Sequence, residues 1–241
     1  PNKAFEAYEK SLRFGITDFL IWNRYLILGI ELKEYDRVYK NGMRAIELHP
    51  IQPTLYLFSG FAASYKKEYE TAITLFNKGL NYVVNNKPLK AEFYNYLGDS
   101  YHFFGNDKKS DECYEKSLEL IPDNVVVLNN YSYYLSLREK DLEKAERMSK
   151  KCIELSPNQS TYQDTYGWVL YKLKRFNEAR EWLKKAAEGD SKSPVITEHY
   201  GDVLYQLNLK KEALEYWKKA KNSGGDSELL NKKVREGVLY E

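Results

Sequence analysis

Histidine and cysteine are the side chains of this 241-residue sequence best suited to metal binding or nucleophilic catalysis. A zinc site needs such ligands at short, characteristic spacings, and a cysteine nucleophile needs a base beside it. The three histidines and two cysteines are His49, His102, Cys113, Cys152 and His199. Their spacings match neither kind of site, so we expect no catalytic residue, no metal ligand and no cofactor.

The neighbours of these residues predict structural roles instead. His49 precedes a helix-ending proline and should face solvent, whereas His102 and His199 should be polar surface residues of helices. Cys152 stands at a small packing position and should be buried. Cys113 should be partly exposed.

Other signatures of common functions are also missing from the sequence. It contains no P-loop, no dinucleotide-binding fingerprint and no Gly-x-Ser-x-Gly elbow, which argues against an enzyme. Lys and Arg total 37 against 35 Asp and Glu, and no basic block stands out, which argues against nucleic-acid binding. No apolar run approaches the ~18 residues needed to cross a bilayer, so we expect no direct membrane insertion.

The elements that carry these residues repeat along the chain. Hydrophobic residues make up 43% of the sequence, with 22 Tyr but only 13 Gly and 7 Pro, a composition that favours helices. Small residues recur before an aromatic or apolar residue at intervals of 34, 34, 38, 35, 34 and 34. The series is Ala4, Val38, Ala72, Ser110, Ala145, Ala179 and Ala213. A fixed period of this length indicates a repeat architecture.

The repeat resembles the tetratricopeptide repeat (TPR), a helix-turn-helix unit with a period of 34 residues. The copy "FYNYLGDSYHFFGNDKKSDECYEKSLELIP" matches its pattern of aromatic, Leu-Gly, Tyr, Gly, aromatic and Pro closely. The matching positions are Tyr94, Leu97, Gly98, Tyr101, Gly105, Tyr114 and Pro122. The resemblance implies an all-α fold: an α-solenoid, or right-handed superhelix, of helix-turn-helix repeats with a C-terminal capping helix.

The repeat also makes physical sense, because small residues at the closest approach let two helices pack tightly. Gly167, Ala179 and Ala186 are therefore predicted packing residues. We expect a single array whose segments are 1–18 (a second helix only), 19–52, 53–90, 91–124, 125–159, 160–193, 194–226 and a cap at 227–241. The longer intervals predict a longer connection in "NYVVNNKPLK" and one extra residue in "LREKD". In the cap, Leu230, Val234 and Val238 should cover the last repeat while its charges face water.

In TPR proteins the first helix of each repeat lines a concave groove, which implies where a partner would bind. The first two repeats offer mostly apolar side chains there, among them Leu20, Ile27, Ile30, Leu57, Phe61 and Tyr65. Further along, aromatic rings mix with amides and acids that suit an extended peptide or a protein helix. The predicted groove residues are Asn95, Asp99, His102, Asn129, Tyr133, Asp164, Trp168, Tyr171, Glu198, Asp202 and Tyr205. Asp164 has a simpler reading as a favourable first-turn acid, and Trp168 as a filler between repeats.

One known TPR ligand is not expected. A clamp of Lys, Asn and Arg on successive first helices holds the terminal carboxylate of chaperone tails in some family members. The corresponding positions here are Asn95, Asp99, Asn130, Thr161 and Thr165, with no Lys or Arg. A groove with these acids should repel a free carboxylate.

The predicted function is that of a protein–protein interaction scaffold with a peptide or protein partner in the concave groove. The alternative is an assembly component that acts through convex or edge surfaces or by self-association. The chain begins at Pro1 within a repeat, so we expect it to be part of a longer protein. Its repeats are similar to those of bacterial TPR proteins, which favours the periplasm or cell envelope over the cytoplasm.

Overall fold

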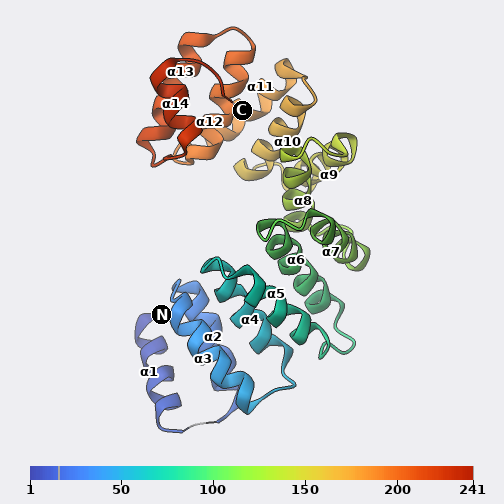
Figure 1. Cartoon of the computed structure of the whole chain (residues 1–241), viewed down its shortest axis with the longest axis vertical. Coiled ribbons are helices and arrows are strands. Elements are labelled where there is room, and N and C mark those ends of the chain that lie inside the picture. Colours follow the sequence, from blue (N-terminus) through green and yellow to red (C-terminus); the bar gives the residue numbers. More distant parts are fainter. Residues whose placement is uncertain (16, 241) are drawn as a thin grey trace. The chain divides into compact units, whose positions relative to one another are not determined.

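The computed structural model describes residues 1–15 and 17–240, and within these ranges it consists of 14 α-helices with no strand (Figure 1). One set begins at or near the predicted starts of complete repeats: α2 (Phe19–Glu31), α4 (Pro53–Tyr65), α6 (Lys87–Phe103), α8 (Val125–Leu137), α10 (Ser160–Lys172) and α12 (Pro194–Gln206). We call these the first helices. The second helices are α1 (Asn2–Arg13), α3 (Tyr35–Leu48), α5 (Tyr69–Leu80), α7 (Asp107–Leu120), α9 (Leu142–Leu155), α11 (Phe176–Gly189) and α13 (Lys210–Asn222). A last helix, α14, spans Glu228–Glu236.

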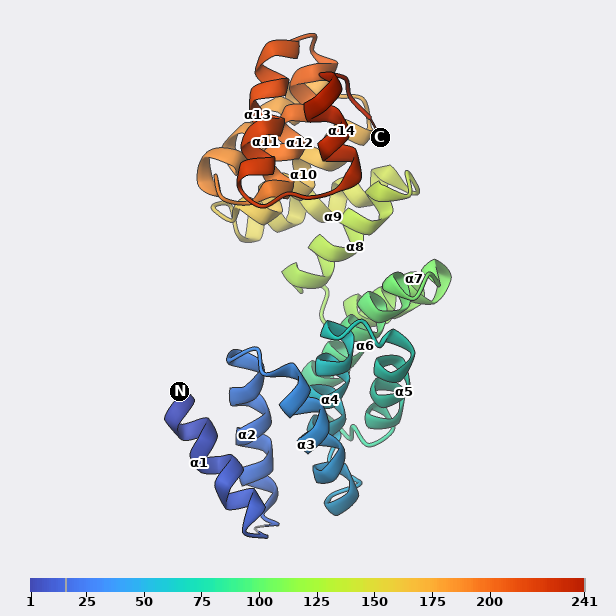
Figure 2. The ribbon, with the colours of Figure 1, turned by 60° about the vertical axis from the view of Figure 1, so that its left-hand side comes forward.

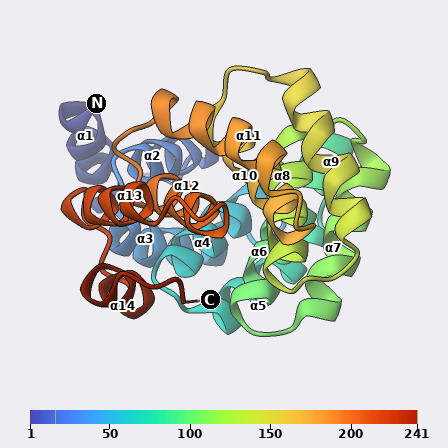
Figure 3. The ribbon, with the colours of Figure 1, turned by 90° about the horizontal axis from the view of Figure 1, so that it is seen from above.

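The helices form two compact units, residues 1–122 and 123–241. In the N-terminal unit α2 packs on α4 and α4 on α6, and each first helix packs on the second helix that follows it (Figure 2). In the C-terminal unit α8, α10 and α12 follow the same pattern, and α14 packs on α13 (Figure 3). Each unit thus has the α-solenoid arrangement that the repeat predicts.

The turns from first to second helix share one backbone conformation. Each contains a residue with positive φ, and the next amide donates to the carbonyl five residues earlier, as after Lys67 (φ 63°), where Glu68 N lies 2.9 Å from Ala63 O. This is the Schellman motif that ends many helices. The left-handed residues are Lys33, Lys67, Gly105, Glu139, Lys174 and Asn208. Only one of the six is glycine, so the other five carry the conformational cost of a side chain.

Small residues of first helices meet bulky residues of second helices, as the sequence predicts. A Cβ on Gly98 would lie 2.6 Å from the Tyr114 ring, and one on Gly167 would lie 2.7 Å from Leu183. Ala179 and Ala186 are fully buried. The packing role predicted for Gly167, Ala179 and Ala186 is confirmed.

The connection predicted in "NYVVNNKPLK" is longer, spanning residues 81–86 where 49–52 join α3 to α4, and the extra residues also lengthen a helix, since α6 has 17 residues where α4 has 13. Two expectations about burial are wrong. Cys113 on α7 is buried rather than partly exposed, because it belongs to the hydrophobic core of the N-terminal unit. In the cap, Leu230 is buried as expected, but Val238 lies beyond the end of α14 and is exposed, while the charged Lys233 is only 3% exposed.

Candidate functional site

A hollow of about 90 Å³ lies between the first helices α2, α4 and α6 of the N-terminal unit. Its lining is apolar and aromatic apart from one carboxyl group, and consists of Ile30, Leu57, Phe58, Phe61, Glu92 and Tyr96. The first helices pack on one another, whereas the second helices α3 and α5 do not. The first helices therefore lie on the inner, concave side. We call the exposed side of α2, α4 and α6 the first-helix face.

Aromatic rings hold the wall of the hollow in place. The Phe61 ring lies 4.8 Å from the Tyr65 ring and 5.3 Å from the Tyr96 ring, between centroids. Tyr65 in turn stacks on Tyr35 of α3 at 4.3 Å. Interlocked rings of this kind have little freedom to lose when a ligand binds, so the surface is suited to binding.

Large apolar side chains on the same three helices remain open to solvent. Leu20 on α2, Tyr65 on α4 and Phe103 on α6 are 63%, 58% and 55% exposed. Ile27 on α2 is exposed as well. Single exposed apolar residues are common, but a group on adjoining helices marks an interaction surface.

Glu92 brings a negative charge to this apolar surface. It is exposed and has no hydrogen bond or ion pair within the described residues, and partial desolvation of its carboxyl group by the surrounding side chains raises its pKa. Burial also raises the pKa of the Tyr96 hydroxyl, and the nearby Glu92 and Asp99 add to the effect. A cation beside Glu92 would relieve this cost, so the site favours a ligand that carries one.

The groove residues predicted on α6 are largely engaged within the chain. The side chain of Asn95 is buried, and Asp99 accepts a hydrogen bond of 2.5 Å from the hydroxyl of Tyr114. His102 is half-buried, with Nδ1 3.5 Å from a carboxylate oxygen of Asp107. Asp99 thus holds in place the ring of Tyr114, which packs against Gly98 on the same helix, α6.

In the C-terminal unit the predicted groove acid Asp164 is buried against the next repeat. Nδ1 of His199 lies 3.0 Å from both carboxylate oxygens of Asp164, and the His199 ring stacks on Trp168 at 3.9 Å. Burial, the largest single influence, lowers the pKa of His199, but the charge and hydrogen bond of Asp164 together with the charges of Asp202 and Glu198 outweigh it, so the pKa is raised overall. The prediction that His199 is a surface residue is wrong. Trp168 fills the gap between repeats.

The predicted groove acids of α12 are neutralised by α14. Nζ of Lys233 lies 2.9 Å from Glu198 Oε1 and 2.8 Å from both carboxylate oxygens of Asp202. The indole N–H of Trp217 donates to Asp202 at 2.8 Å. Burial raises the pKa of Asp202 to about 6, although Lys233 acts against it. The expectation that the charges of the cap face water is therefore wrong for Lys233.

The remaining predicted residues are partly shielded. Asn129 is buried, and Tyr133 is half-buried with its ring 6.3 Å from that of His199. The Tyr171 hydroxyl accepts a hydrogen bond of 3.2 Å from Gln206, and its ring stacks on Trp168. Tyr205 is half-buried and stacks on Trp217. A contact with a partner stays a prediction for these residues.

Two residues that make these contacts between repeats in the C-terminal unit, His199 and Lys233, were not among the predicted groove residues. His199 lies 35 positions after Asp164 and Lys233 lies 35 positions after Glu198, one repeat plus one residue further along the chain, while Asp202 lies 31 positions before Lys233. Tyr171 and Gln206 have the same separation. Complementary side chains at this separation, on successive first helices or on α12 and α14, are therefore the sequence signal that finds these contacts.

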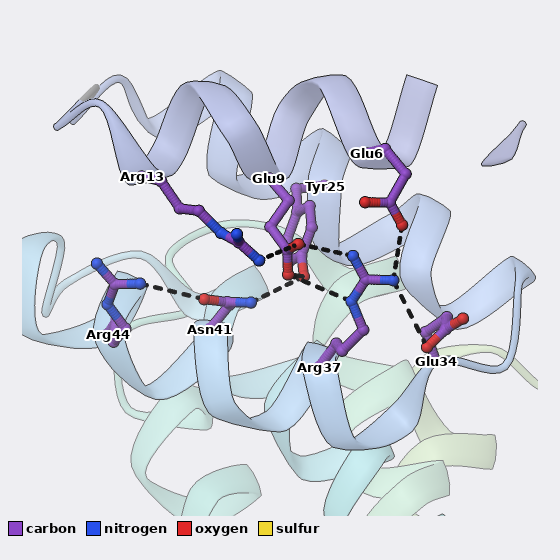
Figure 4. A network of polar contacts seen from close by, with 8 residues as sticks. All are labelled: Glu6, Glu9, Arg13, Tyr25, Glu34, Arg37, Asn41 and Arg44. Atoms are coloured by element: carbon purple, nitrogen blue, oxygen red, sulfur yellow. Dashed lines mark hydrogen bonds and ion pairs between the residues drawn. The ribbon is translucent and has the colours of Figure 1, made fainter. Parts of the chain in front are cut away.

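A second polar network lies in the N-terminal unit between α1, α2 and α3 (Figure 4). At its centre, Glu9 accepts hydrogen bonds from Arg13 (2.9 Å), Arg37 (2.7 Å) and the Tyr25 hydroxyl (3.2 Å). The hydrogen bond from Arg37 is the main reason that the pKa of Glu9 is lowered, while burial raises that of Tyr25 to about 12. Asn41 donates to Tyr25 at 2.8 Å.

Metal binding and membrane crossing find no support in the described part of the chain. It holds no group of three His, Cys, Asp or Glu residues close enough to share a metal ion. Its helices are too short or too polar to span a bilayer. Cys152 is buried, as predicted, and Cys113 is buried too.

Known proteins share this architecture. Two family models described as tetratricopeptide repeat match residues 91–124 and 132–231. The chain belongs to the tetratricopeptide repeat family. Proteins of this family are generally scaffolds without catalytic activity, and their fold implies protein partners.

Curated relatives share only short stretches with the chain. It is 32% identical over 123 residues to heat shock protein STI1 of Saccharomyces cerevisiae, which covers 47% of this chain and 19% of that protein. It is 31% identical over 147 residues to the human protein O-mannosyl-transferase TMTC3, which covers 59% of this chain and 16% of that protein. The chain therefore spans less than a fifth of either relative.

Solved structures show the same fold at low sequence identity. A crystal structure of the APC/C hetero-tetramer Cut9–Hcn1 contains a chain with a TM-score of 0.84 and 12% identity, covering 98% of this chain and 46% of that one. A tetratricopeptide repeat protein from Parabacteroides merdae gives 0.75 and 15%, covering 97% and 90%. Pseudomonas aeruginosa PilF gives 0.63 and 22%, covering 77% and 86%.

Proposed function

We propose that the chain is a non-catalytic scaffold that binds a segment of a protein partner on the first-helix face of its N-terminal unit. An aliphatic side chain of the partner enters the hollow, and a Lys or Arg of the partner lies beside Glu92. The observation that carries this proposal is the hollow itself, formed by three first helices that also carry exposed apolar side chains.

The exposed residues supply most of the proposed binding energy. Fully burying a large apolar side chain is worth about 1.5–3 kcal/mol, so covering the exposed half of one contributes roughly 1 kcal/mol. Leu20, Tyr65 and Phe103 together then account for about 3 kcal/mol, or ~100-fold in affinity. A partner held by these three and by the hollow suits an amphipathic helix or an extended peptide.

The distribution of charge favours a binding site in the N-terminal unit over one in the C-terminal unit. Asp164 already contacts the His199 ring at 3.0 Å, Asp202 contacts Lys233 at 2.8 Å, and Glu198 shares Lys233. Glu92 has no such contact within the described residues. A partner's cation therefore gains more at Glu92 than at any of the acids of the C-terminal network.

Peptide selection tests the proposal without knowledge of the natural partner. Peptides selected from a random library on the immobilised chain should contain an aliphatic or aromatic anchor with a nearby Lys or Arg. Their affinity, measured by fluorescence polarisation, should fall about 100-fold when Leu20, Tyr65 and Phe103 are all changed to Ser. Glu92→Gln should weaken the peptides that carry the cation and spare those without it.

A matched control is available within the same unit. Phe14, Ile51 and Val84 are 78%, 68% and 77% exposed and lie outside the first helices. Changing these three to Ser removes similar exposed apolar area and should leave affinity unchanged. Equal loss in both triple variants, or loss in the control alone, would refute the first-helix face and favour an assembly surface elsewhere on the chain.

A further inference from the structure

A cavity of about 540 Å³ opens between α1 and α3, on a different surface from the first-helix face. We propose that it binds a phosphate dianion, either free or as a phosphorylated side chain of a partner. Its walls carry four cationic side chains, Arg13, Arg37, Lys40 and Arg44, against two carboxylates. The lining residues themselves therefore carry an excess of two positive charges, and Glu34, outside the lining, also lies 3.8 Å from Arg37.

The two carboxylates of the lining, those of Glu6 and Glu9, lie beside Arg37. Arg37 donates to Glu6 at 2.9 Å and to Glu9 at 2.7 Å, so it is already neutralised (Figure 4). Lys40 and Arg44 have no carboxylate within ion-pair distance in the described ranges 1–15 and 17–240. The uncompensated positive charge thus gathers where Lys40 and Arg44 line the cavity.

Arg44 and Arg13 are held in place by the polar network. Arg44 donates to Asn41 Oδ1 at 3.4 Å and lies over the Trp22 ring at 5.8 Å. Arg13 bonds Glu9 with one terminal nitrogen, at 2.9 Å, and its side chain is otherwise 73% exposed. Each guanidinium keeps N–H groups for a ligand, and prior ordering lowers the entropy that binding costs.

Phosphate fits this arrangement better than a carboxylate does. Two guanidinium groups on separate helices and one ammonium group can share three or four phosphate oxygens, with paired N–H donors on each arginine. A carboxylate has two oxygens and one charge, so it satisfies one arginine only. The cavity is also large enough for part of the group that carries the phosphate.

Calorimetric titration of the whole 241-residue chain at low salt tests the assignment. The probes are inorganic phosphate, a phosphoserine peptide with its unphosphorylated form, and succinate. Saturable binding of phosphate or the phosphopeptide is expected, with about tenfold loss for each of Arg13→Gln and Arg44→Gln and more for the double variant. The control changes Lys109 and Lys116, which line another cavity, to Gln and should leave binding unchanged.

The probes also separate the two sources of phosphate. Binding of inorganic phosphate alone identifies a free anion, whereas tighter binding of the phosphopeptide identifies a phosphorylated partner. Three results would overturn the proposal: no saturable binding of either, equal binding by the double variant with normal circular dichroism, or equal binding of succinate. The triple Ser variant of the first-helix face should bind phosphate normally, so this test stands apart from that of the proposed function.

Discussion

Lys233→Met should detach α14 from the C-terminal unit. The lysine Nζ contacts three carboxylate oxygens at 2.8–2.9 Å, and its side chain and that of Asp202 are 4% and 3% exposed. Removing one partner of a buried ion pair costs about 3–5 kcal/mol, because the remaining charge is left without a partner. His199 and the Trp217 N–H still face Asp202, so we expect the free energy of unfolding to fall by about 3 kcal/mol at pH 8, the lower end of this range.

The loss should depend on pH in a defined direction. The pKa of Asp202 in the folded chain, about 6, lies above its ordinary value of 3.8, so ionisation is disfavoured in the folded state. Its contribution to stability is present at low pH and is lost as the pH rises through 6. Without Lys233 the folded pKa rises further. The difference between wild type and variant should therefore be small at pH 5 and large at pH 8.

Urea denaturation followed by far-UV circular dichroism measures the loss, with Lys211→Met on α13 as control. Lys211 is exposed and has no ion pair within the described residues. Because repeat arrays can unfold in parts, hydrogen exchange of the α14 amides gives the local free energy. If Lys233→Met and Lys211→Met unfold at the same urea concentration at pH 8, the proposed neutralisation by Lys233 is refuted.

Three further predictions concern the fold. Lys174→Gly should raise the free energy of unfolding by about 0.5–1 kcal/mol in urea denaturation, because φ is 62° there; a loss would contradict the strain argument. Gly98→Ala should lower it by about 1–3 kcal/mol, since the new Cβ would meet the Tyr114 ring at 2.6 Å; an unchanged value would show that the ring can move. Burial raises the pKa of Cys113 to about 11 and that of Cys152 to about 12, so both thiols should react slowly with a disulfide reagent at pH 8 and rapidly in urea; fast reaction of the folded chain would contradict their burial.

The sequence predicts the helices well because the repeat constrains both backbone and packing. Glycine stands at the Gly98 position of the repeat because the ring of Tyr114 leaves no space there for a Cβ. The positive φ of Gly105 has counterparts at positions where the residue is Lys, Glu or Asn, so those turns follow from the repeat phase and not from residue type.

The candidate site is less predictable, since a polar residue on a first helix can face either a partner or the next repeat. Asp164 and Asp202 occupy groove positions by phase, yet each is buried against a basic side chain, His199 or Lys233, that follows 35 or 31 residues later. Glu92 lacks such a partner and keeps its charge at the surface. The repeat phase therefore predicts where a polar residue lies on its helix. The side chain opposite it on the next repeat determines whether it is buried within the chain or available to a partner.

Site-specific photo-crosslinking in the source cells tests the central claim most directly. A benzoylphenylalanine at position 65 or 103, on the first-helix face, should give adducts with the same partner. The same group at position 51 or 84, where Ile51 and Val84 are even more exposed, should give none with that partner. Adducts formed only from 51 or 84, or equally from all four positions, would contradict binding on the first-helix face.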